Sequence, residues 1–164
     1  MKRTILKSSM ILCFALFFVV SLCGCNTDEF KRNEKYVSDV KELVNESVNY
    51  TRKLKKLDED FVCHDAELVN EYIETTEKLM DIFQQIQKLQ PTDEFDDKDK
   101  DLKEAAKNEL TIISQLRNLV LHANQNGDDT IYQREKVNCF EEYKKYYDQA
   151  IDISSEIQTY WRNA

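Results

Sequence analysis

Two cysteines and both histidines are the side chains in this sequence best suited to bind a metal ion. Cys63 and His64 are adjacent, and His122 and Cys139 lie much further along the chain. Thiolate and imidazole groups are preferred ligands of zinc and related transition metals. Because the spacing of these four residues matches no standard zinc motif, we predict ordinary surface or half-buried side chains here, with no metal and no cofactor.

The same two cysteines raise the question of a disulfide. They are the cysteines that follow Cys25 in the chain, and outside the cytoplasm such a pair can become oxidised. A disulfide requires Cα atoms within about 7 Å of each other. The predicted helices place Cys63 and Cys139 on diagonal helices with an axial offset of roughly 8–12 Å. The sequence leaves both alternatives open and favours two free thiols.

Catalytic chemistry has little support in the sequence. There is no G-x-S-x-G, no H-E-x-x-H, no glycine-rich phosphate loop and no C-x-x-C after Cys25. Carboxylates are numerous but are typical of solvated helix faces, so we expect a protein that is not an enzyme. The 31 acidic and 23 basic side chains give a net charge of -8. This balance argues against nucleic acid as a partner, because phosphate backbones are bound by Lys and Arg.

Tyrosine is enriched near the C-terminus, where it could form a binding surface. Tyrosine offers a large contact area with a polar tip and is favoured at interfaces. Tyr143 and Tyr147 belong to an apolar stripe, whereas Tyr132 and Tyr146 do not. One interpretation is packing in and around the core. The other is a partner-binding face that contains Tyr132 and Tyr146.

The composition predicts an all-α fold. Only two glycines and one proline occur in 164 residues, whereas sheet-rich folds need frequent turn residues. Apolar residues recur at intervals of three and four in four segments, as expected for amphipathic helices. The predicted helices cover about 28–57, 60–90, 97–124 and 130–162. The clearest stripe, in the last segment, consists of Phe140, Tyr143, Tyr147, Ala150, Ser154, Ile157 and Trp161.

Local signals mark the breaks between these helices. Pro91 ends the second helix, and the acidic residues from Asp93 to Asp101 suit the N-terminus of the third. Gly127 suits a left-handed C-cap. Thr130 and Gln133 fit a capping box at the start of the fourth helix, with Thr130 as the N-cap.

The break near Asp58 has the weakest signal. The segment 42–46 (ELVNE) recurs at 67–71, and the second copy would follow the first by roughly seven turns of a helix. One continuous helix could therefore carry both copies on the same face. We favour a break, because very long helices are uncommon in globular domains. The predicted fold is then an antiparallel up-down-up-down four-helix bundle.

The N-terminal segment is typical of an export signal. Lys2, Arg3 and Lys7 precede an apolar run from Met10 to Val20, and the run ends in Leu22-Cys23-Gly24-Cys25. This ending resembles the lipobox of bacterial lipoproteins, with Cys23 where Ala or Ser is more usual. The resemblance implies a diacylglycerol on the Cys25 thiol and cleavage before Cys25. Residues 1–24 would be the signal peptide and 25–164 the helical bundle domain. The alternatives are a plain secretory signal cut elsewhere and an uncleaved anchor.

These features together predict a lipid-anchored protein on the extracytoplasmic face of the cell membrane. Removing residues 1–24 takes three positive charges from a chain of net charge -8, which leaves -11. An anionic membrane would repel such a body, so the lipid would hold it there. We expect a non-catalytic binding or spacer module at the cell envelope that contacts an envelope protein or a ligand. The alternative is a lipoprotein that binds a metal or small ligand at the Cys/His end or inside the bundle.

Overall fold

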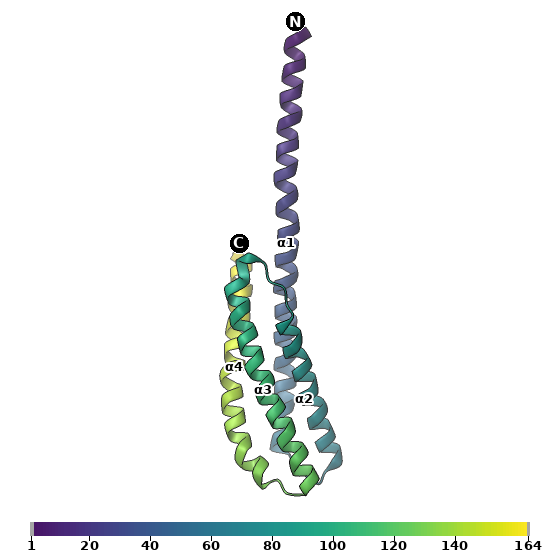
Figure 1. Ribbon diagram of the computed structural model, residues 1–164, viewed down its shortest axis with the longest axis vertical. Coiled ribbons are helices and arrows are strands. Elements are labelled where there is room, and N and C mark those ends of the chain that lie inside the picture. The colour runs from purple at the N-terminus through teal and green to yellow at the C-terminus, as the bar shows by residue number, and fades with distance from the viewer. Residues whose placement is uncertain (1, 164) are drawn as a thin grey trace. The chain divides into compact units, whose positions relative to one another are not determined.

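The computed structural model describes the backbone of residues 2–163 and the side chains of residues 28–163. Within that part the chain is helical, with no strand (Figure 1). The helices are α1 (Lys2–Glu59), α2 (Ala66–Gln87), α3 (Asp96–Asn126) and α4 (Thr130–Asn163), and the short 3-10 helix η1 (Asp93–Phe95) precedes α3. The prediction of an all-α fold is confirmed.

The chain divides into two compact units, Met1–Lys35 and Tyr36–Ala164. The first unit contains the predicted export signal, and the Cys25 side chain lies outside the residues whose side chains are described. The spacing of apolar residues in segment 28–57 predicts Phe30 on the core stripe, but Phe30 is 57% exposed, so this prediction is wrong. In the part of the chain with described side chains, no helix combines the length and the hydropathy needed to cross a membrane.

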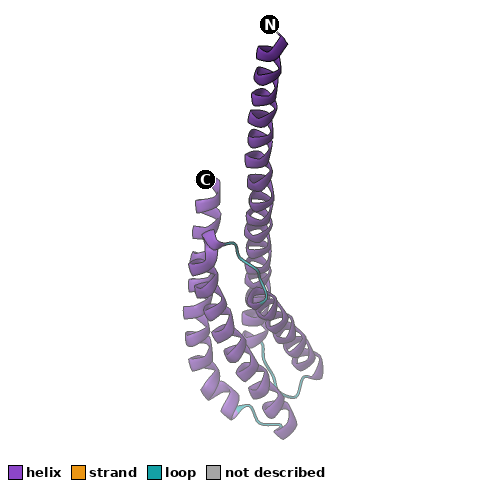
Figure 2. Cartoon of the chain, turned by 45° about the horizontal axis from the view of Figure 1, so that its top comes forward, coloured by secondary structure: helices purple, strands orange, loops and turns teal. Residues whose placement is uncertain are grey.

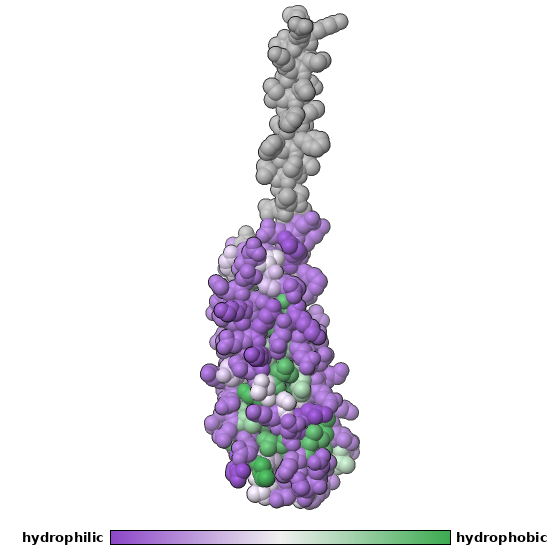
Figure 3. Space-filling view, viewed as in Figure 1, coloured by the Kyte–Doolittle hydropathy of each residue, from purple (hydrophilic) through white to green (hydrophobic). Residues whose placement is uncertain are grey.

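The second unit holds the hydrophobic core. In this unit α3 packs against both α2 and α4 (Figure 2). The outer surface seen in Figure 3 is mostly hydrophilic and carries only small apolar areas. On α4, Tyr143, Ala150, Ser154 and Ile157 of the predicted stripe are buried, and the other three members are partly buried against the core.

The weak break near Asp58 is present, so α1 and α2 are separate helices. The alternative of one continuous helix is wrong. Asp65 causes α2 to begin at Ala66 rather than near residue 60, because its carboxylate accepts hydrogen bonds from the backbone N–H groups of Glu67 and Leu68, both at 3.1 Å. The connection between the helices also buries Phe61 and Cys63, which a longer α2 could not do.

The other two breaks follow their local signals, with shifts of a few residues. α2 ends at Gln87, slightly before the predicted end, and α3 opens with Asp96, Asp97 and Asp99 in its first turn. This acidic start is favourable at the positive end of the helix dipole. The earlier end of α2 lets the Leu89 carbonyl accept a hydrogen bond at 2.7 Å from Lys103 of α3.

Gly127 forms the predicted left-handed C-cap of α3. Its φ is +63°, and its N–H donates to the Ala123 carbonyl. The capping box is wrong by one residue, because α4 already begins at Thr130. The Thr130 N–H and hydroxyl instead donate to the Asp128 carboxylate at 2.9 and 2.6 Å. An Asp shortly before the helix therefore performs the role expected of the Thr130 side chain.

Candidate functional site

The structure does not gather the four candidate metal-binding residues into a site. Cys63 is buried, Cys139 is half-buried, and His64 and His122 are exposed. Among the described side chains, no group of three or more His, Cys, Asp and Glu residues could hold a metal ion. The Cys/His end of the bundle therefore gives no support to the metal-binding alternative.

The thiols of Cys63 and Cys139 are both free. Burial raises the pKa of the Cys139 thiol, and the charges of Glu142 and Glu135 raise it further. A thiol with a raised pKa is a poor nucleophile near neutral pH, because the thiolate is the reactive form. The half-buried Cys139 is thus unsuited to thiol catalysis.

Tyr132 cannot belong to an exposed partner-binding face, so that part of the sequence prediction is wrong. The side chain is only 1% exposed. Its hydroxyl donates to the Asp58 carboxylate and lies 3.2 Å from the Tyr72 hydroxyl. The Phe61 ring packs against it, with the ring centroids 4.4 Å apart. The apolar periodicity of α4 missed Tyr132 because its burial depends on groups from α1, α2 and the connection between them.

Tyr146, the other residue of the predicted face, lies at the edge of the core. Its side chain is half-buried and packs against the core, and the Lys145 ammonium lies 5.0 Å from the ring centroid. This position leaves part of the ring accessible. A role of Tyr146 in binding a partner remains a prediction, but Tyr132 is no longer part of the predicted face.

Two carboxylates inside the second unit share one pattern of partners, a tyrosine hydroxyl and a lysine. Asp99 of α3, 4% exposed, accepts a hydrogen bond at 3.0 Å from Tyr36 and lies 2.6 Å from the Lys103 ammonium. Asp58 of α1 is bonded to Tyr132 and lies 3.1 Å from the Lys136 ammonium. These contacts join helices that are distant in the sequence.

Both networks hold their tyrosines in the neutral form. Burial raises the pKa of Tyr36, and the neighbouring Asp99 raises it further. Burial likewise raises the pKa of Tyr132, with contributions from Tyr72 and Asp58. The phenols therefore stay protonated as hydrogen-bond donors, and neither network offers a base or a nucleophile near neutral pH.

Glu109 of α3 is the most unusual side chain of the second unit. It is 1% exposed, and neither of its carboxylate oxygens has a hydrogen-bond partner. Burial alone raises its pKa from the ordinary 4.5 to about 8. A carboxyl group of this kind is neutral at mildly acidic pH and becomes a buried, unpaired charge when it ionises.

Tyr143 and Tyr147 of α4 are the ionisable neighbours of Glu109, since its charge contributes to raising the pKa of both. The Tyr143 hydroxyl is already engaged, in a 2.7 Å hydrogen bond with the Thr51 hydroxyl of α1. The Tyr147 ring stacks on Tyr143, with centroids 5.9 Å apart. The nearby Tyr143 hydroxyl is thus already satisfied by a partner other than Glu109.

The sequence contained a signal for Glu109 that the periodicity argument did not use. The apolar residues of segment 97–124 that recur at helical spacing include Ala106 and then Ile113, which are two helical turns apart. One turn after Ala106, the stripe requires a residue at 109 or 110. Glu109 occupies that position. An acidic residue inside an apolar stripe is the pattern to look for.

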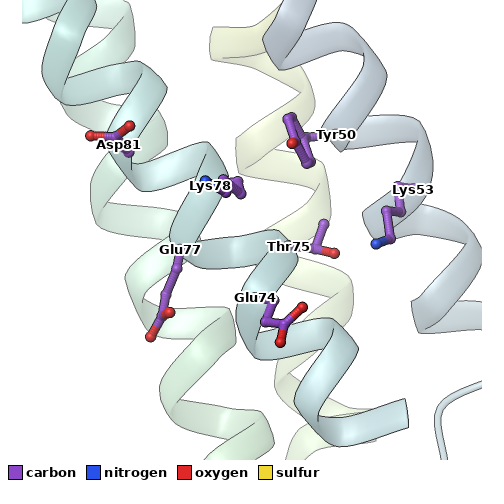
Figure 4. Close-up of a pocket in the computed structure, with 7 residues that line it drawn as sticks. All are labelled: Tyr50, Lys53, Glu74, Thr75, Glu77, Lys78 and Asp81. Carbon is purple, nitrogen blue, oxygen red and sulfur yellow. The ribbon is translucent and has the colours of Figure 1, made fainter. Parts of the chain in front are cut away.

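A surface groove lies between α1 and α2. Its volume is about 350 Å³, and Tyr50 and Lys53 of α1 face five residues of α2 across it (Figure 4). The α2 residues are Glu74, Thr75, Glu77, Lys78 and Asp81. Two of the charged groups have partners elsewhere, because Lys53 pairs with Glu71 and Glu77 pairs with Arg117. The groove is therefore polar and of mixed charge.

Chemically, these sites can bind protons and polar groups, but they do not assemble a nucleophile with a base. Glu109 has the pKa of a general base, yet its side chain is only 1% exposed and does not line the groove. The expectation of a protein without catalytic activity stays a prediction. No family model, curated protein or solved structure matches this chain.

Proposed function

We propose that this chain is a lipid-anchored protein of the bacterial cell envelope, with a helical body that acts as a non-catalytic binding or spacer module. The observation that carries the proposal is the sequence Leu22-Cys23-Gly24-Cys25 at the end of a charged and then apolar leader. Two acyl chains are needed for stable membrane anchoring, at about 0.8 kcal/mol per buried methylene. A diacylglycerol on Cys25 provides both chains.

The charge of the body is consistent with an anchor made of lipid. After cleavage before Cys25 the chain carries a net charge of -11, because Lys2, Arg3 and Lys7 leave with the signal and the whole chain carries -8. Such a body gains nothing electrostatically from an anionic membrane surface. On the extracytoplasmic face it would be available to an envelope protein or a soluble ligand.

We also infer that the body is an up-down-up-down bundle, a form suited to a spacer. Asp58 near the end of α1 meets Tyr132 near the start of α4, while the earlier Thr51 meets the later Tyr143. These two pairs support opposite directions for α1 and α4. Short connections join successive helices, as expected for this topology.

The anchor is tested by replacing the modified cysteine in the full chain. We expect the wild type, grown with an alkyne analogue of palmitate, to carry the label and to fractionate with membranes. Cys25→Ser should lose the label and remain unprocessed. Cys23→Ser is the matched control, because it removes a neighbouring thiol but keeps the aliphatic residue, two small residues and Cys25.

Two results would contradict the proposal. One is a labelled, membrane-bound Cys25→Ser protein, because no other thiol lies at the cleavage position. The other is a mass spectrum of the purified wild type with an unlipidated N-terminus. The binding role, as distinct from the spacer role, would be contradicted if crosslinking in intact cells found no neighbour of the body.

A further inference from the structure

We propose that Glu109 is a proton-controlled switch in the core of the second unit. With its proton bound, Glu109 lets α3 pack closely against α4, and loss of the proton to solvent opens that contact. This inference concerns the helical body and does not depend on the lipid anchor.

The geometry around Glu109 explains why ionisation is costly. The side chain is 1% exposed, and both carboxylate oxygens lack a hydrogen-bond partner. A buried carboxylate needs a counter-charge or several donors to remain stable. Exposed carboxylates avoid the penalty by contacting water, and Glu109 can do so only if the helices around it separate.

The helices packed around Glu109 bring no counter-charge to it. From α4 it faces Tyr143 and Tyr147, whose pKa values it helps to raise. From α1, the charge of Arg52 acts to lower the pKa of Tyr147, and the Lys55 ammonium lies 5.9 Å from the centroid of the Tyr147 ring. From α2, the Phe83 ring lies 6.4 Å from the Tyr143 ring. Burial is the cause of the raised Glu109 pKa, with no contribution from any charged side chain.

The hydrogen bond between Tyr143 and Thr51 provides the element that can rearrange. In the closed form these two hydroxyls, 2.7 Å apart, satisfy each other. When Glu109 loses its proton, the carboxylate becomes a stronger acceptor than the Thr51 hydroxyl. A Tyr143 hydroxyl that turns to donate to the Glu109 carboxylate would leave Thr51 of α1 without this partner and admit water between the helices.

Hydrogen exchange followed by mass spectrometry tests the switch on the full chain in detergent micelles. After correction for the intrinsic pH dependence of exchange, we expect local opening of segments 105–113 and 140–147 to increase between pH 5 and 9. The increase should be roughly several hundredfold, since burial moves the Glu109 pKa from 4.5 to about 8. Tyr143 and Tyr147 remain protonated in this range, because their pKa values are raised.

Two variants make the test specific. Glu109→Gln keeps the shape of the side chain but cannot ionise, so the pH dependence of opening should disappear. Glu104→Gln is the matched control, because Glu104 is an exposed glutamate on the same helix, and it should behave as the wild type does. Equal pH dependence in wild type and Glu109→Gln would overturn the proposal.

A direct titration keeps the proposal testable even if Glu109→Gln fails to fold. The chemical shift of the Glu109 carboxyl carbon in 13C-labelled wild-type protein reports its ionisation. We expect a midpoint near pH 8, as burial predicts. A midpoint in the ordinary glutamate range, close to 4.5, would show that the closed form tolerates the charge and would overturn the switch.

Discussion

Asp99 and Glu109 lie on the same helix, α3, and both carboxyl groups are almost completely buried, yet their surroundings differ. Asp99 has a tyrosine donor at 3.0 Å and a lysine ammonium at 2.6 Å. Glu109 has no hydrogen-bond partner for either oxygen. Burial alone therefore does not determine what an acidic side chain does in a helical core. A paired carboxylate holds helices together, whereas an unpaired one limits the pH range in which they stay packed.

The largest effect should come from removing the unpaired charge. Glu109→Gln is expected to raise the free energy of unfolding by about 3 kcal/mol at pH 7, because the native pKa of Glu109 is about 8 and the unfolded value is about 4.5. Between pH 4.5 and pH 8 the native state binds more protons than the unfolded state, so the free energy of unfolding of the wild type falls as the pH rises. Urea unfolding at pH 4, 7 and 8.5 measures the effect.

The difference between this variant and wild type should nearly vanish at pH 4, where Glu109 is largely neutral in both the native and the unfolded state, and reach its full size above pH 8. Glu104→Gln serves as the control for loss of a surface charge. If the free energy of unfolding of the wild type increased from pH 5 to 8, ionised Glu109 would not be destabilising and would not differ from Asp99 in this respect.

The opposite sign is expected for the paired carboxylate. Asp99→Asn should lower the free energy of unfolding by about 2 kcal/mol, because it leaves the Lys103 ammonium without its partner and weakens the bond from Tyr36. Thermal unfolding at pH 7 measures it, with the exposed Asp101→Asn on the same helix as control. If Asp99→Asn instead raised the free energy of unfolding, both buried carboxylates would destabilise the native state.

The network at Asp58 extends the comparison to a second paired carboxylate. Tyr132→Phe should lower the free energy of unfolding by about 1.5 kcal/mol, because it removes the donor to Asp58 and the contact with the Tyr72 hydroxyl. Tyr146→Phe, at the half-buried edge of the core, is the control and should change stability by less than about 0.5 kcal/mol. If both substitutions changed the free energy of unfolding equally, the Tyr132 hydroxyl would not stabilise the protein through this network.

The smallest effect should come from the lysine of the Asp99 network. Lys103→Met is expected to lower the free energy of unfolding by about 1 kcal/mol, since Lys103 is partly exposed and also donates to the Leu89 carbonyl. The exposed Lys107→Met on the same helix is the control. A loss larger than that of Asp99→Asn would place the main contribution in the Leu89 contact and not in the ion pair.

The sequence was sufficient for features that depend on nearby residues. Pro91 and Gly127 mark real ends of helices, and the acidic start of α3 is present, because proline, glycine and helix dipoles act over one turn. Asp65 and Asp128 were missed as capping residues. Each accepts a hydrogen bond from a backbone N–H group at the start of the helix, in a geometry that the folded loop provides.

Features that depend on distant residues could not be predicted in the same way. The burial of Tyr132 requires Asp58, which lies on the first helix of the chain, and periodicity along one helix carries no information about that partner. The apolar stripe of the third helix passes the position of Glu109, but it could not show that the Glu109 carboxyl group has no partner there. That absence is decided by which side chains of the other helices turn toward Glu109.

Gly127 has a further consequence for how the chain tolerates sequence change. Its φ of +63° disfavours other residues, and a β-carbon there would lie 2.9 Å from Cε1 of His64. Two separate obstacles thus coincide at one exposed corner of the protein. The exposed His64 ring can turn away from a new β-carbon, so in a saturation mutagenesis library the backbone conformation should set the tolerance, with Asn and Asp accepted better than β-branched residues.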